Sequence, residues 1–240
     1  LADSYISVIE ALKHGGMANN VKVKMSWIDT EEVEQKGTGI LKQFDGIVVP
    51  QGWGSRGAEG KIRTIQYCRE KKVPYFGLCY GMQMAVIEFA RNVLKLKDAN
   101  SEEVNPKSPH KVIHLMEEQK ELIAKRQYGG TIRLGGWPCK LVKGTRLAKI
   151  YAKKFGEENV ISERHRHRYE YNNDYREQFE KAGLKIAGTS PDNKLVEAVE
   201  ISGHPFFIGT QFHPEYISRP LDPHPLFAEF IKVCSQIKKK

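Results

Sequence analysis

The sequence predicts an α/β fold, and two observations lead to that prediction. Short apolar runs alternate with helical patterns over roughly the first ninety residues, which is typical of strands joined by right-handed helical crossovers. The run Val73–Leu78 leads directly into a cysteine between glycines and then into another helical pattern, as in the strand–turn–helix of many α/β enzymes. The chain has 240 residues without a linker-like segment, so we expect one domain over residues 1–240.

The elements of the first half follow from the periodicity of apolar residues. The spacing i, i+3, i+4 and i+7 from Tyr5 predicts a helix that ends at Gly15 and Gly16. Alternating apolar and polar residues over 21–27 predict a half-buried strand, and the apolar run Ile47–Val49 predicts a buried parallel one. The next elements are expected as helix 59–72, strand 73–78 and helix 82–92.

The second half contains more strand patterns than helix patterns. Residues 98–130 have weak periodicity and are expected to form loops around a strand at 112–116. Short strand patterns follow at 131–134, 140–143, 160–169, 184–189, 195–201 and 206–212. Apolar residues on one stripe predict a last helix over 225–238.

Composition and charge exclude several classes of protein. Hydrophobic residues make up 40% of the chain and charged residues 28%, which excludes a disordered or collagen-like chain. No apolar run approaches the roughly 20 residues of a membrane helix. The net charge of +9 comes without a recognisable nucleic-acid-binding module. We therefore expect neither a membrane nor a nucleic acid as a partner.

The cysteines and the N-terminus bear on location and completeness. The four cysteines form no CxxC pair, which favours neither a zinc finger nor a disulfide framework. We therefore expect a reduced, cytoplasmic protein. The N-terminus has no signal-peptide pattern and does not begin with methionine, so we expect a processed or excised piece.

Cys79 is the candidate nucleophile. It lies in Gly77-Leu78-Cys79-Tyr80-Gly81, between a predicted strand and a predicted helix, and this is the nucleophile-elbow pattern with cysteine in place of serine. Such a turn is strained and leaves no room for neighbouring side chains, which is why it needs both glycines. The partial positive charge of the helix start favours the thiolate. The alternative is a buried structural cysteine in a glycine-flanked loop.

His213 and Glu215, in the segment QFHPEY, are the candidate base and its orienting partner. The proline after His213 pushes the backbone toward extended conformations, and residues two apart on extended backbone face the same side. Glu215 can then bind one imidazole nitrogen while the other nitrogen faces the sulfur, as an activated nucleophile requires. The alternative for the histidine is an ordinary surface residue.

Two glycine-rich segments are candidates for oxyanion or anion binding. Residues 50–57, PQGWGSRG, follow a buried strand directly, at the sheet edge where open α/β folds bind ligands. They lack the GxxxxGK[ST] pattern of a phosphate-binding P-loop. Residues 129–135, GGTIRLG, form the second segment.

Residues 163–170, ERHRHRYE, form an unusual basic segment. If the segment is extended, its three arginines share one face and its two histidines share the other with Tyr169. Three guanidiniums on one face suit carboxylate or phosphate groups, and the alternative is an exposed, solvated strand. No third ligand accompanies the two histidines in the nearby sequence, so we expect no metal site.

Together these motifs resemble the class I glutamine amidotransferases, and more narrowly the C-terminal glutaminase domain of CTP synthase. GLCYGMQ resembles the family's nucleophile motif and HPE its histidine–glutamate pair. The narrower resemblance depends on GWGSRGAEGKI, ANSEE, GGTIRLG, ERHRHRYE and HPEYISRPLDPHPLF, which stand in family order from about residue 3 to residue 235. The resemblance implies an open, mostly parallel twisted sheet with helices on both faces.

The resemblance also implies an activity. The protein would hydrolyse L-glutamine to glutamate and ammonia through a glutamyl thioester on Cys79, with His213 moving the proton and Glu215 orienting His213. The Tyr80 amide and an amide of the loop at Gln51 and Gly52 would hold the oxyanion. By position, the residues that would bind the glutamine substrate are Gly52, Trp53, Gln83, Glu103 and Arg168. Of these, Glu103 would pair with the α-ammonium group and Arg168 with the α-carboxylate.

Two positions depart from the family pattern. The family usually has Gly-Gly-Phe where this chain has Gln51-Gly52-Trp53, and leucine where this chain has Tyr80. Glycine at position 51 would let the loop peptide flip freely, and Gln51 removes that freedom. A low basal glutaminase activity is the expected consequence.

No segment matches the N-terminal synthetase (amidoligase) domain of CTP synthase. We therefore expect no cofactor in this chain, with ATP, magnesium and UTP bound only by that absent domain. The expected partners are L-glutamine and the synthetase domain, which would use the ammonia to aminate UTP to CTP. That domain would belong to the same longer chain or to a separate one, and any oligomer would form through it.

Two other classes of function stay open at this point. The first is another class I amidotransferase, such as the GMP synthetase type, or a γ-glutamyl hydrolase, although ERHRHRYE argues against both. The second is a non-catalytic regulatory or assembly module that keeps the fold but has lost turnover through Gln51.

Overall fold

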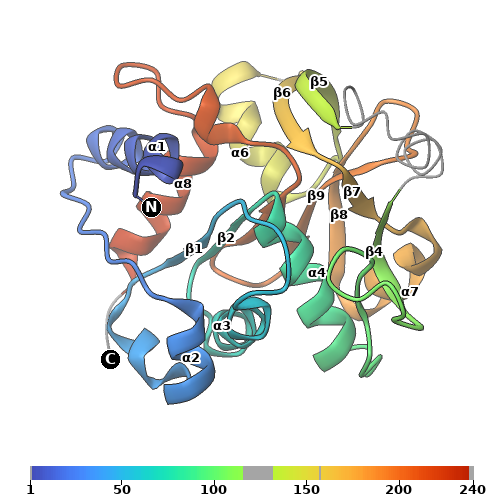
Figure 1. Cartoon of the computed structure of the whole chain (residues 1–240). Coiled ribbons are helices and arrows are strands. Elements are labelled where there is room, and N and C mark those ends of the chain that lie inside the picture. The colour runs from blue at the N-terminus through green and yellow to red at the C-terminus, as the bar shows by residue number, and fades with distance from the viewer. Residues whose placement is uncertain (1, 116–131, 157, 238–240) are drawn as a thin grey trace.

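The computed structural model describes residues 2–115, 132–156 and 158–237 (Figure 1). Up to Leu115 the chain forms η1 (Ala2–Tyr5), α1 (Ile6–Ala18), α2 (Thr30–Lys36), η2 (Thr38–Gln43), β1 (Ile47–Val49), α3 (Ala58–Lys71), β2 (Tyr75–Leu78), α4 (Tyr80–Asn92), β3 (Asn100–Ser101) and β4 (Lys111–Leu115). The later part forms β5 (Arg133–Leu141), α6 (Arg146–Phe155), β6 (Val160–His167), β7 (Tyr169–Tyr171), η3 (Asn173–Tyr175), α7 (Arg176–Ala182), β8 (Leu184–Thr189), β9 (Val196–Ile201), β10 (Phe207–Thr210), η4 (Pro214–Tyr216) and α8 (Pro225–Gln236).

A seven-stranded sheet in the order β1-β2-β10-β9-β8-β5-β6 runs through the middle of the fold. β1, β2 and β10 pair in parallel, and the other neighbours pair antiparallel. As a result β8 and β6 run in the same direction as these three, and only β9 and β5 run against them. β3, β4 and β7 form a smaller three-stranded sheet. The predicted open α/β sheet with mostly co-directional strands is confirmed.

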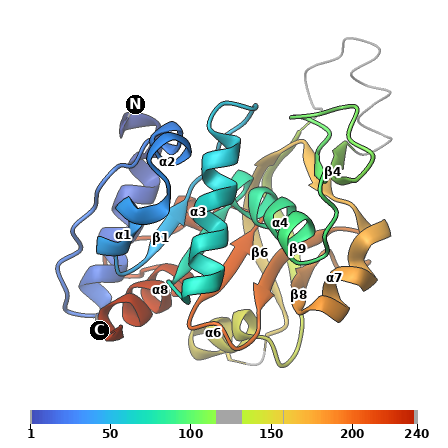
Figure 2. The same ribbon diagram turned by 90° about the horizontal axis from the view of Figure 1, so that it is seen from below.

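Helices cover both faces of the large sheet, as predicted. α1, α6 and α8 lie on one face, and α3, α4 and α7 lie on the other (Figure 1). Figure 2 shows α3 and α4 side by side in their layer. Neighbouring strand residues alternate between the two faces: Tyr75 and Phe207 belong to the core under α3 and α4, whereas Phe76 and Ile208 belong to the core under α1 and α8.

The prediction that Gly15 and Gly16 end the first helix is wrong, because α1 continues to Ala18. Both glycines are buried where the helix meets other backbone. A Cβ atom on Gly15 would lie 2.7 Å from the carbonyl oxygen of Phe227 in α8, and one on Gly16 would lie 2.8 Å from the carbonyl oxygen of Val21. These glycines therefore allow close packing and do not act as a stop signal.

The predicted strand at 21–27 is also wrong, since these residues form no strand. Their apolar side chains pack against helices and rings, not on a sheet face. Val23 packs against the core under α1 and α8, and Trp27, which is 58% exposed, lies with its ring centroid 5.4 Å from that of Tyr5.

The remaining differences concern element boundaries and short helices. The patterns at 131–134 and 140–143 belong to one strand, β5, which pairs with β6 from Arg133 to Lys140. The short helices α2, α6 and α7 were not predicted. The predicted ends at Met116, Thr131 and Lys238 lie outside the described residues.

Candidate active site

The turn between β2 and α4 has the geometry of a nucleophile elbow. Cys79 has φ 51° and ψ −99°, a positive-φ backbone conformation that is strained for any residue except glycine. A Cβ atom on Gly81 would lie 2.1 Å from the carbonyl oxygen of Val49 in β1, and one on Gly77 would lie 2.8 Å from the carbonyl carbon of Gly81. Both predicted glycines are therefore required by close backbone contacts.

The sulfur of Cys79 is enclosed but not sealed, since the residue is 6% exposed. Its backbone amide donates to the carbonyl oxygen of Thr210 over 2.7 Å, which ties the elbow to β10. The side-chain amide of Gln211 lies 3.6 Å from the sulfur and donates to it. Gln211 is a site residue that the sequence reasoning did not identify, although it stands two residues before His213 in the motif QFHPEY.

The other cysteines have environments that suppress the thiolate. Burial raises the pKa of Cys68 and of Cys139, and burial raises the pKa of Cys234 to about 12. A thiolate is the nucleophilic form of cysteine. Cys79 is therefore the cysteine best placed for chemistry in the described part of the chain.

His213 and Glu215 form the predicted pair. His213 follows β10 and caps the short helix η4, and its Nδ1 lies 2.7 Å from Oε1 of Glu215. The Nε2 atom is buried without a hydrogen-bond partner among the described residues. Burial alone would lower the pKa of His213, but interactions with the Cys79 sulfur and the Glu215 carboxylate outweigh it and raise that pKa to about 10. The imidazole therefore lies between a carboxylate and the candidate nucleophile.

The loop after β1 lies against the start of α4. A Cβ atom on Gly52 would lie 3.3 Å from the ring of Tyr80, and the Tyr80 hydroxyl donates to the carbonyl oxygen of Gly54. Gln51 reaches toward η1, with its side-chain amide 3.5 Å from the Ser4 carbonyl oxygen. The loop that would supply an oxyanion amide is thus held directly beside the residue that follows the nucleophile.

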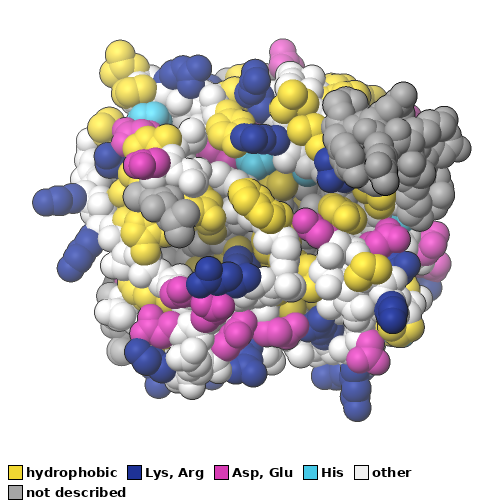
Figure 3. All heavy atoms as spheres, in the orientation of Figure 1, with side chains coloured by type: hydrophobic (Ala, Val, Ile, Leu, Met, Phe, Trp, Pro, Cys, Tyr) yellow, Lys and Arg dark blue, Asp and Glu magenta, His cyan; other side chains and the backbone are white. Residues whose placement is uncertain are grey.

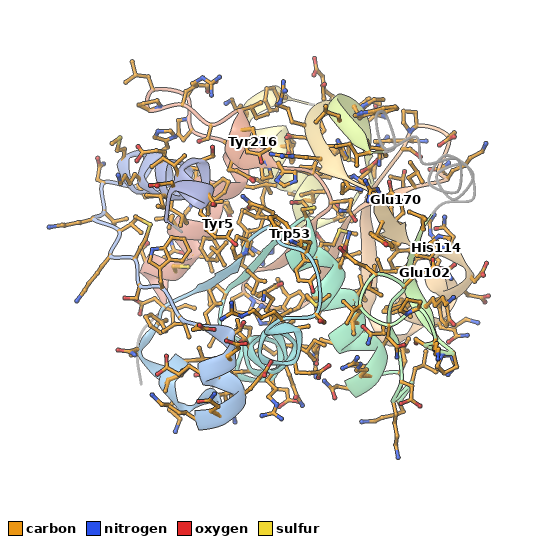
Figure 4. All side chains as sticks on the ribbon, in the orientation of Figure 1. Tyr5, Trp53, Glu102, His114, Glu170 and Tyr216 are labelled. Carbon is orange, nitrogen blue, oxygen red and sulfur yellow. The ribbon has the colours of Figure 1, made fainter. Side chains whose placement is uncertain are left out.

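Trp53 extends from this loop into solvent. Its side chain is 82% exposed, and Figure 4 places it over the start of α4, between Tyr5 on one side and Glu170 on the other. In the same view Tyr216 lies above it. Trp53 is therefore at the mouth of the site, not in its floor.

Three predicted substrate-binding residues come from separate segments. Gln83 in α4 is buried and donates to the Tyr169 carbonyl oxygen over 3.1 Å and to Oε1 of Gln211 over 3.3 Å. Burial raises the pKa of Glu103, while the Gly54 backbone and the Arg168 guanidinium act in the opposite direction. Glu103 therefore lies within electrostatic reach of both the oxyanion loop and Arg168, so that a carboxylate and a guanidinium share one rim.

The segment ERHRHRYE forms β6 and β7, and its alternation is confirmed up to His167. Arg164 and Arg166 are exposed, whereas Glu163, His165 and His167 are buried. His165 lies 2.7 Å from Glu197 in β9, and Arg133 in β5 binds Glu197 over 2.8 Å. The histidines therefore belong to a buried ionic network, and the described residues contain no group of three or more potential metal ligands.

This network places unusual protonation states behind the site. Burial raises the pKa of Glu170 to about 8, with Arg133 opposing that change. Burial lowers the pKa of His167, and the charges of His165 and Arg133 lower it further. Arg133 and Glu197 were not identified from the sequence, because each lies in an ordinary strand pattern far from the segment it contacts.

The surface around the site is mixed in character. In the space-filling view, histidine and basic side chains appear between hydrophobic ones below the end of β6, whereas acidic side chains gather lower on the same face over α2 and α3 (Figure 3). Within the described residues, no helix is long and apolar enough to cross a membrane.

Comparisons with known sequences agree on one family. A family model for class I glutamine amidotransferases matches residues 1–233. The chain is 54% identical to a CTP synthase of Caldanaerobacter subterraneus subsp. tengcongensis over 239 residues, which are 99% of this chain and 43% of that relative. It is 59% identical to a CTP synthase of Carboxydothermus hydrogenoformans over 240 residues, which are 100% of this chain and 43% of that relative. The chain thus spans less than half the length of these relatives.

Comparisons with solved structures give a matching answer. The glutaminase domain of Trypanosoma brucei CTPS, solved with bound acivicin, is 38% identical with a TM-score of 0.89, and the match covers 99% of this chain and 90% of that chain. A GMP synthase protein of Thermoplasma acidophilum is 17% identical with a TM-score of 0.52, and that match covers 90% of this chain and 81% of the other. The second likeness is one of fold alone.

Proposed function

Since this chain belongs to the class I glutamine amidotransferases, as a glutaminase domain of the CTP synthase type, we propose that it hydrolyses L-glutamine to glutamate and ammonia with Cys79 as the nucleophile. One observation carries the proposal. The strained elbow presents the Cys79 sulfur to an imidazole that Glu215 holds over 2.7 Å. That arrangement of nucleophile, base and orienting group is the one that covalent acyl transfer requires.

The proposed reaction has two halves. The Cys79 thiolate attacks the side-chain carbonyl carbon of glutamine, and the His213 imidazolium gives its proton to the amide nitrogen. The carbon–nitrogen bond then breaks, ammonia leaves, and a glutamyl thioester stays on the sulfur. His213 next takes a proton from water, the resulting hydroxide attacks the thioester carbon, and glutamate leaves as the Cys79 thiolate forms again.

The oxyanion of both tetrahedral intermediates would form beside the start of α4. The Tyr80 amide, which follows the nucleophile, is one proposed donor, and an amide of the Gln51–Gly52 loop is the other. Packing of Gly52 against the Tyr80 ring supports this role, because it keeps the two donors at one place. Glu215 would act only on His213, by holding Nδ1 so that Nε2 faces the sulfur.

The substrate would lie across the rim formed by the loop, Glu103 and Arg168. Glu103 would accept the α-ammonium group, and Arg168 would bind the α-carboxylate through its planar fork. Gln83, Gly52 and Trp53 would contact the rest of the molecule. The convergence of Glu103, Gly54 and Arg168 supports this placement, since these groups are distant in the sequence.

Arg168→Lys tests the carboxylate contact. Lysine keeps the charge but loses the bidentate fork, so we expect the KM for glutamine to rise by about tenfold or more, with a smaller fall in kcat. Steady-state hydrolysis over a range of glutamine concentrations measures both constants. Arg164→Lys is the matched control, because Arg164 is exposed in the same segment. An unchanged KM in Arg168→Lys would mean that Arg168 is structural.

Gln51→Gly tests the departure from the family pattern. We expect kcat to rise, by up to about a hundredfold if one oxyanion donor is recovered, because glycine would populate the flipped loop peptide that glutamine disfavours. Gln51→Ala is the control, since it also loses the contact with Ser4 but gains no such freedom. Equal or lower activity in the glycine variant, with the synthetase partner present and absent, would refute this explanation.

The fate of the ammonia follows from the relatives. The relatives named above are CTP synthases, and this chain spans 43% of their length. We propose that the ammonia passes to a synthetase domain, in the same longer chain or a separate one, which aminates UTP to CTP. ATP, magnesium and UTP would bind to that domain, any oligomer would form through it, and this chain would need no cofactor. A nucleophilic thiol must stay reduced, which fits the expected cytoplasmic location.

Production of glutamate from L-glutamine is the direct test. We expect the chain to release glutamate and ammonia in equal amounts, and more rapidly when the synthetase part is present with its nucleotides. No release under either condition would favour the non-catalytic module instead. A γ-glutamyl peptide hydrolysed in preference to glutamine would favour the γ-glutamyl hydrolase alternative.

A further inference from the structure

We propose that Tyr216 is a positioning residue for His213, and that Arg166 in turn holds Tyr216. The Tyr216 ring stacks on the imidazole and fixes its plane between Glu215 and Cys79. This inference rests on the proposed function, because it assigns a task to a side chain that does not touch glutamine. Tyr216 stands directly after the histidine–proline–glutamate motif.

The stack follows from the local backbone. Pro214–Tyr216 form the short helix η4 with His213 as its cap, and the Tyr216 amide donates to the His213 carbonyl oxygen over 3.2 Å. Such a helix has about three residues per turn, so that side chains three apart lie one above the other. The ring centroids of His213 and Tyr216 accordingly lie 4.9 Å apart with an interplanar angle of 11°.

A second constraint on His213 is needed, because the bond to Glu215 fixes only one nitrogen. The ring can still swing about that bond, and a swing would carry Nε2 away from the sulfur. The backbone is already fixed, since the His213 amide donates to the Arg164 carbonyl oxygen over 2.7 Å. A ring stacked face to face on the imidazole removes the remaining freedom at the side chain.

β6 holds both members of the stack. Its Arg164 carbonyl binds the His213 backbone, and two residues further on the Arg166 guanidinium interacts with the Tyr216 hydroxyl. Burial and the Glu215 charge raise the pKa of Tyr216, and the interaction with Arg166 acts in the opposite direction. Arg166 therefore acts through Tyr216 and not on the substrate, which separates it from Arg168.

The stack also favours one protonation state. The face of an aromatic ring attracts a cation, so the Tyr216 ring stabilises the imidazolium form of His213 and with it the Cys79 thiolate. The other groups that act on His213 are Cys79 from the elbow and Glu215 from η4, and His167 from β6. Loss of the ring should therefore move thiolate formation to higher pH.

Tyr216→Leu and Tyr216→Phe separate the stack from the hydroxyl. For Tyr216→Leu we expect kcat to fall by about tenfold to a hundredfold, with the KM for glutamine changed by less than about twofold. We expect the midpoint of the pH profile for alkylation of Cys79 by iodoacetamide to rise by about half a unit. Tyr216→Phe keeps the ring and should recover most of kcat and the midpoint.

Tyr175→Leu is the matched control. Tyr175 is also half-buried at the end of a short helix and contacts a histidine ring, that of His110 with centroids 6.2 Å apart. It lies outside the proposed site, so its loss should lower stability without changing kcat or the alkylation midpoint. If Tyr216→Leu does not fold, Arg166→Gln replaces it, because it releases the ring without altering η4. Its shifts should be smaller and in the same direction.

A normal kcat and an unchanged midpoint in Tyr216→Leu would overturn the proposal. It would also be overturned if Tyr216→Phe were as impaired as Tyr216→Leu, since the hydroxyl and not the stack would then be responsible. Alkylation of Cys79 needs no turnover of glutamine. A wild-type chain that does not hydrolyse glutamine would therefore refute the proposed function, while the alkylation profiles would still test the stack.

Discussion

Cys79→Ala is expected to abolish glutamine hydrolysis while leaving the fold intact. Without the sulfur no thioester forms, and we expect kcat to fall by more than about a thousandfold. Alanine is smaller than cysteine and keeps the same backbone strain at φ 51°, so the elbow should retain its shape. Release of glutamate measures the first effect, and the thermal midpoint of unfolding measures the second.

Selective labelling provides the complementary test of Cys79. An electrophilic glutamine analogue should alkylate Cys79 first, because burial raises the pKa of each of Cys68, Cys139 and Cys234. Mass spectrometry of the digested protein identifies the modified thiol. Cys139→Ala is the control, and it should be labelled at the wild-type rate. Rapid modification of Cys139 with Cys79 untouched would sink the assignment of the nucleophile.

The elbow and the histidine–glutamate pair were predictable because their chemistry is local in the sequence. The glycines around Cys79 and the proline after His213 restrict the backbone directly, so that five or six consecutive residues specify the geometry. The bond between His213 and Glu215 joins residues two apart. The proposed stack of Tyr216 on His213 was equally local, and the three-residue spacing in HPEY was its signal.

The buried network behind the site was not predictable in the same way. Glu197 and Glu200 lie in the strand β9 and are both buried, against the ordinary preference of glutamate for the surface. Glu197 binds Arg133 and His165, while Glu200 accepts the amides of Arg146 and Leu147 at the start of α6. These partners are far away in the sequence, and only the topology of the sheet brings them together.

The short helices show a different limit. α6 had a readable signal, because Thr145 caps it by accepting the Ala148 amide over 3.1 Å and Leu147, Ile150 and Tyr151 form its buried stripe. That stripe is shorter than the span over which helical periodicity is usually judged. Strand patterns on both sides dominated the interpretation of that region. The error over Gly15 and Gly16 had the opposite cause, since close packing and helix termination use the same residue.

Gly81→Ala is the substitution with the largest expected effect on both stability and activity. Its Cβ atom would lie 2.1 Å from the Val49 carbonyl oxygen, which is backbone and cannot rotate away as a side chain would. Either β1 or the start of α4 must move, and we expect the free energy of unfolding to fall by about 3 kcal/mol. Any such movement also displaces Cys79 and the Tyr80 amide, so kcat should fall by about a hundredfold or more.

Gly39→Ala separates this contact from a general cost of replacing glycine. A Cβ atom on Gly39 meets nothing within 4 Å, and its φ is outside the positive range, so stability should change little. Thermal unfolding and glutamine hydrolysis of both variants give the comparison. If Gly81→Ala unfolded at the wild-type temperature with normal kcat, the elbow would have to tolerate a side chain against β1. The close contact between α4 and Val49 would then not be what positions the nucleophile.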